Sequence, residues 1–95
     1  MKLVVAPAAL AELDNAANFY VKNADAVLGL ALVSEFERAA NLVLNNPALG
    51  TDFRSRYKRF ILRRFPYSII YQVAAAEIRI LAVAHHRRRP GYWTK

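Results

Sequence analysis

Three strand-like runs stand close together in the second half of this chain and constrain its fold more than any other feature. The runs cover residues 57–64, 67–73 and 77–84. Only two or three residues join each run to the next, whereas parallel neighbours need a crossover of about a dozen residues or more. The middle run alternates as a strand does, with Tyr67 and Ile69 on one side and Ser68 and Ile70 on the other. The runs therefore predict an antiparallel meander.

Two helical patterns precede the meander. In residues 8–22, apolar side chains recur at the spacing of one helix face. The second pattern runs from Asp25, a favourable N-cap, to about Asn45, and it is apolar around most of its circumference. A helix this apolar is expected to be buried on more than one side. The short break at residues 23–24 indicates that the two helices form an antiparallel hairpin.

The remaining segments complete a fold prediction. Residues 2–6 form a β-branched run typical of a strand, and residues 47–56 are expected to be a loop. A chain of 95 residues is long enough for one hydrophobic core. We therefore predict a single domain over residues 1–95 with the order β-α-α-β-β-β. In this α+β fold, a helical hairpin packs on one face of a small, mostly antiparallel sheet.

The composition excludes several classes of protein. The chain has no Cys and two His, so we expect no disulfide, no metal and no other cofactor. The acidic residues are scattered, and Ser34 and Ser68 have no evident base–acid arrangement, so glycosidase and serine-hydrolase sites are not expected. The longest apolar run, residues 26–33, is far shorter than the roughly 20 residues of a membrane span. We expect a cytoplasmic protein with no membrane contact.

Positive charge is concentrated in the second part of the chain. Residues 1–53 hold three basic and six acidic side chains, and residues 54–95 hold eleven basic side chains and one acidic one. The net charge is +7 in total, from −3 in the first part and +10 in the second. This asymmetry indicates one surface that faces a polyanion, either a nucleic acid or an acidic protein.

The cations fall along the first strand of the meander and in the tail after the last strand. Those expected to contact a polyanion or an acidic target are Arg54, Arg56, Lys58, Arg63, Arg87, Arg88 and Arg89. Aromatic residues lie between the cations of the first group, as in surfaces that hold phosphates and stack bases. The alternative is a solvated face, or a charged edge that protects the sheet.

His85 and His86 end the last strand, where adjacent side chains point to opposite faces. Only one of them can therefore face a given site. Cleavage of a phosphodiester by the ribose 2′-hydroxyl needs a base, an acid and cations on the developing charge. The residues that could supply these groups are His86, Tyr92, Arg59 and Arg64. The alternative is that both histidines are structural or surface residues.

Two segments resemble the RelE/ParE superfamily, the toxins of bacterial type II toxin–antitoxin modules that are also called plasmid stabilisation proteins. They are residues 63–71 (RRFPYSIIY) and residues 80–93 (ILAVAHHRRRPGYW). The resemblance covers nearly the whole chain and implies the fold predicted above. It also implies a small ParD- or RelB-like antitoxin whose tail wraps the helices and sheet, so a hetero-oligomer is expected. Because residues 54–95 are so basic, we expect this antitoxin to be acidic and encoded by a neighbouring gene.

The superfamily implies two activities, and the residues around Tyr67 favour one of them. RelE-like members cut messenger RNA on the ribosome and place an arginine directly after the tyrosine that Tyr67 matches. Here Ser68 follows, and a second RelE-like arginine falls at about His86. Arg59 and Tyr92 do match nuclease positions. Loss of one cation from the transition state reduces such a rate by roughly 10²–10³, so the sequence favours the ParE-like branch.

The resemblance therefore predicts a ParE-like toxin that inhibits DNA gyrase without catalysis of its own and is neutralised by its antitoxin. The alternative is a RelE-like, ribosome-dependent mRNA endonuclease (mRNA interferase) with His86 as acid or base. A third reading is a toxin-like fold retained only as an antitoxin-binding or regulatory partner. No antitoxin-binding residue follows from the sequence.

Overall fold

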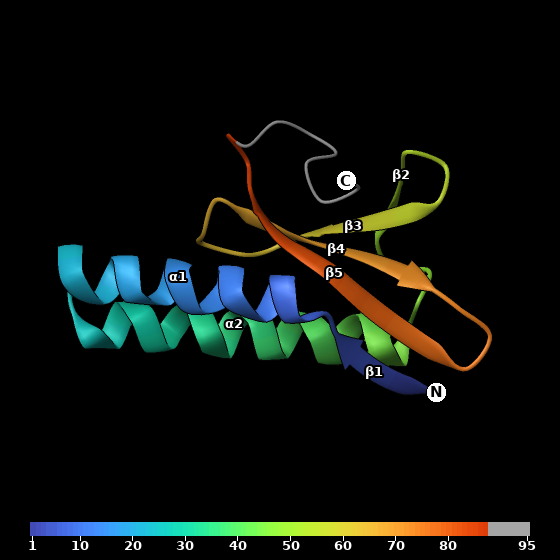
Figure 1. The fold of residues 1–95 in the computed structure, drawn as a ribbon, viewed down its shortest axis with the longest axis horizontal. Coiled ribbons are helices and arrows are strands. Elements are labelled where there is room, and N and C mark those ends of the chain that lie inside the picture. The colour runs from blue at the N-terminus through green and yellow to red at the C-terminus, as the bar shows by residue number, and fades with distance from the viewer. Residues whose placement is uncertain (88–95) are drawn as a thin grey trace.

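A five-stranded sheet carries two antiparallel helices on one of its faces (Figure 1). The structure is a computed structural model and describes residues 1–87. Its elements are β1 (Lys2–Val5), α1 (Pro7–Asn23), α2 (Ala26–Asn45), β2 (Thr51–Phe53), β3 (Tyr57–Ile61), β4 (Tyr67–Val73) and β5 (Glu77–His85). The strand order is β1-β5-β4-β3-β2, and only β1 and β5 pair in parallel. The predicted α+β fold, with a helical hairpin on a mostly antiparallel sheet, is confirmed.

The structure adds one strand to the predicted order. The segment 47–56, predicted to be a loop, contains β2, which pairs with β3. Tyr71 of β4 fixes the chain that enters β2, because its hydroxyl donates to the Pro47 carbonyl (2.8 Å) and accepts from the Gly50 N–H (2.9 Å). A strand of three residues carries too little alternation for a sequence pattern to reveal it.

The strand predicted over residues 57–64 is shorter than expected, because β3 ends at Ile61. Leu62 and Phe65 are buried and anchor the β3–β4 turn that follows. Arg64, between them, has a φ of 69°, which a strand does not permit. Arg63 and Arg64 therefore lie in a turn, and the prediction that the strand continues to residue 64 is wrong.

The helical hairpin begins and turns as the sequence predicts. Pro7 lies in the first turn of α1, and Asp25 caps α2 by accepting a hydrogen bond from the Leu28 N–H (2.8 Å). Gly29 then allows the two helices to approach closely. A Cβ at this position would lie 2.9 Å from the Ala17 carbonyl oxygen of α1.

The apolar circumference of α2 is only partly buried. Leu32, Phe36 and Val43 pack into the core between the helices and the sheet. Val27 and Leu30 are instead 75% and 67% exposed, because the hairpin extends beyond the sheet at this end (Figure 1). The prediction of burial on more than one side is therefore wrong for the first two turns. In the part of the chain that the structure describes, neither helix combines the length and the apolarity that a membrane crossing requires.

A β-bulge in β5 changes which of its side chains face the helices. Ile70 of β4 lies opposite Ala82, and Tyr71 lies opposite Ile80, so Leu81 has no partner. Side chains alternate along a strand, and one extra residue shifts that alternation by one position. Before the bulge, the even-numbered residues of β5 face the helices, and after it the odd-numbered residues do.

Glu35 of α2 ties the helices to the β3–β4 turn. Its carboxylate accepts from the Arg63 N–H (2.6 Å) and pairs with Arg38 (2.7 Å), and its side chain is only 11% exposed. The hydrogen bond from Arg38 is the main reason why the pKa of Glu35 lies below its usual 4.5. The ionised carboxylate therefore stabilises the folded chain.

We expect Glu35→Ala to lower the free energy of unfolding by about 1–2 kcal/mol, because the Arg63 N–H loses a charged acceptor. The matched control Glu37→Ala, on the exposed side of the same helix, should stay within about 0.5 kcal/mol of the original chain. Since the folded-state pKa of Glu35 is lowered, its stabilisation is present above pH 4.5 and is lost as the pH falls through the folded-state pKa. Urea unfolding over this pH range measures both effects, and equal losses in the two variants would contradict the prediction.

Candidate functional site

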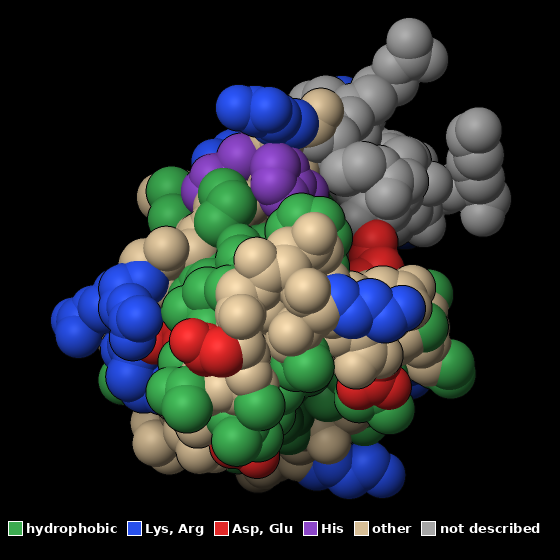
Figure 2. Space-filling model, turned by 90° about the vertical axis from the view of Figure 1, so that its left-hand side faces the viewer, with side chains coloured by type: hydrophobic (Ala, Val, Ile, Leu, Met, Phe, Trp, Pro, Cys, Tyr) green, Lys and Arg blue, Asp and Glu red, His purple; other side chains and the backbone are tan. Residues whose placement is uncertain are grey.

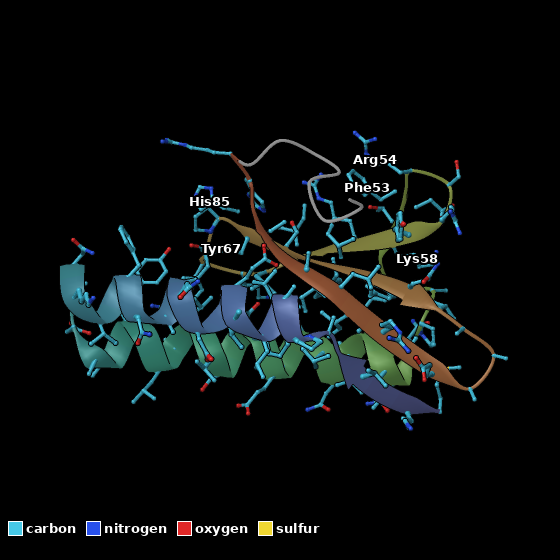
Figure 3. The ribbon with its side chains drawn as sticks, viewed as in Figure 1. Phe53, Arg54, Lys58, Tyr67 and His85 are labelled. Carbon is cyan, nitrogen blue, oxygen red and sulfur yellow. The ribbon has the colours of Figure 1, made fainter. Side chains whose placement is uncertain are left out.

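Aromatic side chains line up at the end of the molecule where α1, the β3–β4 turn, β4 and β5 meet. We call them the aromatic strip: Phe19, Tyr20, Phe65, Tyr67 and His85. Ring centroids lie 5.7 Å apart for Phe19 and Tyr20, 5.4 Å apart for Tyr20 and Phe65, and 5.0 Å apart for Tyr67 and His85. All three contacts are edge-to-face. Figure 3 labels Tyr67 and His85, which lie together above α1.

A cleft of about 250 Å³ opens between α1 and the strip, and we call it the α1–β5 cleft. It is lined by Glu12, Asn15, Ala16, Phe19, Tyr67, Val83 and His85. The Val83 N–H donates to the Glu12 carboxylate (3.0 Å), since β1 pairs with β5 only as far as Ile80. Glu12 therefore faces the sheet, although the helical pattern assigns it to the polar side of α1. Burial, with a smaller effect of Tyr20, raises the pKa of Tyr67 above 10.0, so its phenol stays a hydrogen-bond donor.

Three arginines belong to the segments that carry or follow the aromatic strip. The Arg64 guanidinium carbon lies 5.5 Å from the Phe65 ring centroid, within reach of a cation–π contact. Arg63 belongs to the same turn, and Arg87 follows β5, where its N–H donates to His85 Nδ1 (3.0 Å). None of the three forms an ion pair within residues 1–87. Figure 2 looks onto this end of the molecule and shows hydrophobic side chains below the histidines, with cations above and to the left.

Of the other predicted contact residues, Arg54, Arg56 and Lys58 lie at the opposite end of β3. Arg54 and Arg56 belong to the β2–β3 turn, and the Arg54 guanidinium carbon lies 5.8 Å from the Phe53 ring centroid. Lys58 pairs with Asp52 (2.8 Å), and their hydrogen bond raises the pKa of the ammonium and lowers that of the carboxyl. Among the described residues, the predicted contact cations therefore lie in two separate groups, and Figure 3 shows Arg54 of one group well apart from His85, which Arg87 follows closely.

Ser68 and His86 meet on the face of the sheet opposite the helices, which we call the distal face. Ser68 Oγ and His86 Nε2 lie 2.9 Å apart, and Ser68 is only 2% exposed. Ser68 therefore has a histidine beside it that the sequence did not indicate, because the His86 main-chain N–H bonds to the Pro66 carbonyl and extends the β4–β5 pairing. The contact holds the imidazole in one orientation, and the buried hydroxyl is closed to a substrate in this structure. Arg59 also lies on the distal face, paired with Ile70.

The nuclease candidates are divided between two sides of the molecule. Arg59 and His86 lie on the distal face, whereas Arg64 lies beside Phe65, whose ring contacts α1. The remaining candidate, Tyr92, lies outside the described residues, as do Arg88 and Arg89. Across residues 1–87, no three His, Asp or Glu side chains come close enough together to hold a metal ion.

A family model described as "ParE toxin of type II toxin-antitoxin system, parDE" matches residues 3–90. The chain belongs to this ParE toxin family. It is therefore a type II toxin, and the family implies a cognate antitoxin. The fold is also similar to a solved structure titled "Chromosomal ParDE TA system from P. aeruginosa", with a TM-score of 0.79 and 24% identity over 90% of this chain and 95% of that one. No curated protein matches the sequence.

Sequence reasoning on this ParE-family chain missed the aromatic strip, although one signal for it was present. Phe19 and Tyr20 are adjacent in a helix that otherwise consists mostly of small and polar residues. Two adjacent residues cannot both point into the core from one helix. Tyr20 takes the inner position against Phe65, and Phe19 remains 57% exposed.

Proposed function

We propose that this ParE-family toxin inhibits DNA gyrase by binding to it, and that its antitoxin relieves the inhibition. The observation that carries the proposal is Ser68. RelE-like ribonucleases have an arginine at this position, whereas here the residue is a buried serine that holds His86. A ribonuclease without that cation loses a stabilising group worth roughly 10²–10³ in rate. The match to the ParE family supports the same branch.

Cations of the β2–β3 turn and of the segment that follows β5 are the candidates for contact with gyrase. Arg54 and Arg56 project from the β2–β3 turn, and Arg87 begins the run of three arginines after β5. Exposed cations of this kind steer association with an acidic protein surface. Lys58 is a weaker candidate, since Asp52 already neutralises it. The proposal places the action of the toxin in the cytoplasm.

The test is a pair of assays on the purified toxin, one of gyrase supercoiling and one of ribosome-bound message cleavage. We expect inhibition of supercoiling and an intact message. Cleavage without inhibition would establish the alternative, a RelE-like endonuclease with His86 as acid or base. A protein that does neither but binds the antitoxin would be a fold retained for regulation.

His86→Ala separates the two activities. Under the proposed function, the variant should inhibit gyrase within about twofold of the original toxin, because His86 has no part in a binding contact. A nuclease would instead lose about 10²-fold or more in rate with its general acid or base. Circular dichroism and antitoxin binding verify the fold. A well-folded His86→Ala protein without toxicity would overturn the proposal, whereas Arg87→Glu should weaken inhibition.

A further inference from the structure

We propose that the aromatic strip and the α1–β5 cleft form the docking surface for an acidic, amphipathic segment of the antitoxin. The inference rests on the proposed function only for the existence of that antitoxin, and it does not depend on which target the toxin inhibits. Its support comes from an apolar anchor, from the charge around that anchor, and from the contrast with the other exposed apolar face.

The apolar anchor is Phe19 at the edge of the cleft. Phe19 is 57% exposed and its ring touches Tyr20, so the free chain leaves a large aromatic residue in water. Beside it, the cleft offers about 250 Å³ between Phe19, Tyr67 and His85. An aromatic residue next to an open cleft is typical of an interaction site, where one large apolar side chain of the partner fills the space.

The charge around the strip selects an acidic partner. Arg63, Arg64 and Arg87 make no ion pair within residues 1–87. The carboxylates of the helices near them are already engaged, since Glu12 accepts from Val83 and Glu35 accepts from Arg63 and Arg38. Acidic side chains on the partner would therefore meet unpaired cations rather than competing carboxylates, which favours fast and selective association.

The other exposed apolar face does not share this chemistry. Val27 and Leu30 lie on the outer side of α2, in a stripe that continues through Ser34 to Glu37. This stripe holds no cation and ends at a carboxylate, so an acidic segment would find no opposite charge along it. The strip is therefore the face that fits this partner.

Docking on the strip also accounts for neutralisation. Arg87 borders the strip through His85 and belongs to the cations proposed for gyrase contact. An antitoxin segment seated in the cleft would cover Arg87 and compete with the target for it. The antitoxin-binding surface and the gyrase-binding surface would then share Arg87, while their other contact residues differ.

The experiment measures the affinity of purified toxin variants for the full-length antitoxin encoded beside the toxin gene, by calorimetry and by association kinetics at low and high salt. Phe19→Asp should weaken binding by about 30-fold or more, as the loss of a central anchor does. Its matched control Val27→Asp, also on an exposed helix position, should stay within about threefold. Arg64→Glu should slow association mainly at low salt, whereas Arg56→Glu in the β2–β3 turn should not.

A second variant guards against a folding defect at Phe19. Asn15→Trp fills the cleft from an exposed position of α1 and should also weaken binding by about tenfold or more, by steric exclusion. Urea unfolding confirms that each variant is folded. The inference is overturned if Phe19→Asp and Asn15→Trp bind like the original toxin, or if Val27→Asp is impaired as much as they are. Gyrase assays on the original toxin test the proposed function separately. If that toxin failed to inhibit gyrase, the proposed function would be wrong, but the antitoxin-binding results would still stand.

Discussion

Gly29→Leu is expected to lower the free energy of unfolding by about 3 kcal/mol or more. A Cβ on Gly29 would lie 2.5 Å from Val21 Cγ2 and 2.9 Å from the Ala17 carbonyl oxygen. The Val21 side chain can rotate, because it is exposed, but the Ala17 oxygen can move only with the backbone of α1. The added side chain must therefore push the two helices apart and loosen the packing of the core beneath them.

Gly29→Ala tests the same contact with the smallest possible change. Helix propensity alone would stabilise α2 by about 1 kcal/mol, whereas overpacking against a backbone atom opposes it by about 1–3 kcal/mol. We therefore expect a net loss, smaller than that of Gly29→Leu. Ser34→Ala, at an exposed position of α2, is the control and should be neutral or slightly stabilising. Urea unfolding with an unchanged m-value measures all three variants, and a stabilised Gly29→Ala would show that the helices have room to spare.

Tyr71→Phe is expected to lower the free energy of unfolding by about 2–3 kcal/mol. Tyr71 is fully buried, and its hydroxyl serves two backbone groups, the Pro47 carbonyl and the Gly50 N–H. The phenylalanine ring keeps the packing but leaves both groups without their partner, and Gly50 is itself buried. Hydrogen exchange should show that the loss is concentrated in residues 47–53, which the hydroxyl holds.

Tyr20→Phe is the matched control, since the Tyr20 hydroxyl makes no hydrogen bond to residues 1–87 and its removal should change stability by less than about 0.5 kcal/mol. A pH series adds a second readout. Burial is the main reason why the pKa of Tyr71 lies above 10.0, so its stabilisation is complete below pH 10.0 and is lost as the pH rises through the folded-state pKa. The difference between the original chain and Tyr71→Phe should therefore shrink in alkali, and a constant difference would contradict the assignment.

The main helices and strands could be predicted because the spacing of apolar side chains typical of each recurs several times along its length. The helices α1 and α2 span several turns, β4 alternates over its whole length, and Asp25 marks the beginning of α2. The strand β2 and the β3–β4 turn have no such period. They depend on contacts from elsewhere in the chain, where Tyr71 holds Gly50 and Glu35 holds the Arg63 N–H. Local patterns cannot report contacts between residues more than 20 positions apart.

The candidate sites were predictable only as far as neighbouring residues determine them. The separation of His85 and His86 onto opposite faces follows from strand geometry and is confirmed by their contacts with Tyr67 and Ser68. Which histidine takes which face depends on the unpaired Leu81, and a bulge of this kind leaves no mark in the sequence. The aromatic strip was missed for a similar reason, because its members come from α1, the β3–β4 turn, β4 and β5, which only the fold brings together.

The hydrogen bonds that join the helices to the sheet tolerate substitutions in the sheet. Glu12 and Glu35 each accept a hydrogen bond from a main-chain N–H, at Val83 and Arg63. Every residue except proline offers the same donor, so substitutions at these positions leave the connection between the layers intact. A toxin built in this way can exchange the side chains of its turn and strand ends, and with them its choice of partner, while the scaffold stays as it is. Divergence among toxins of this design would therefore be fastest at the turns and slowest at the two glutamates.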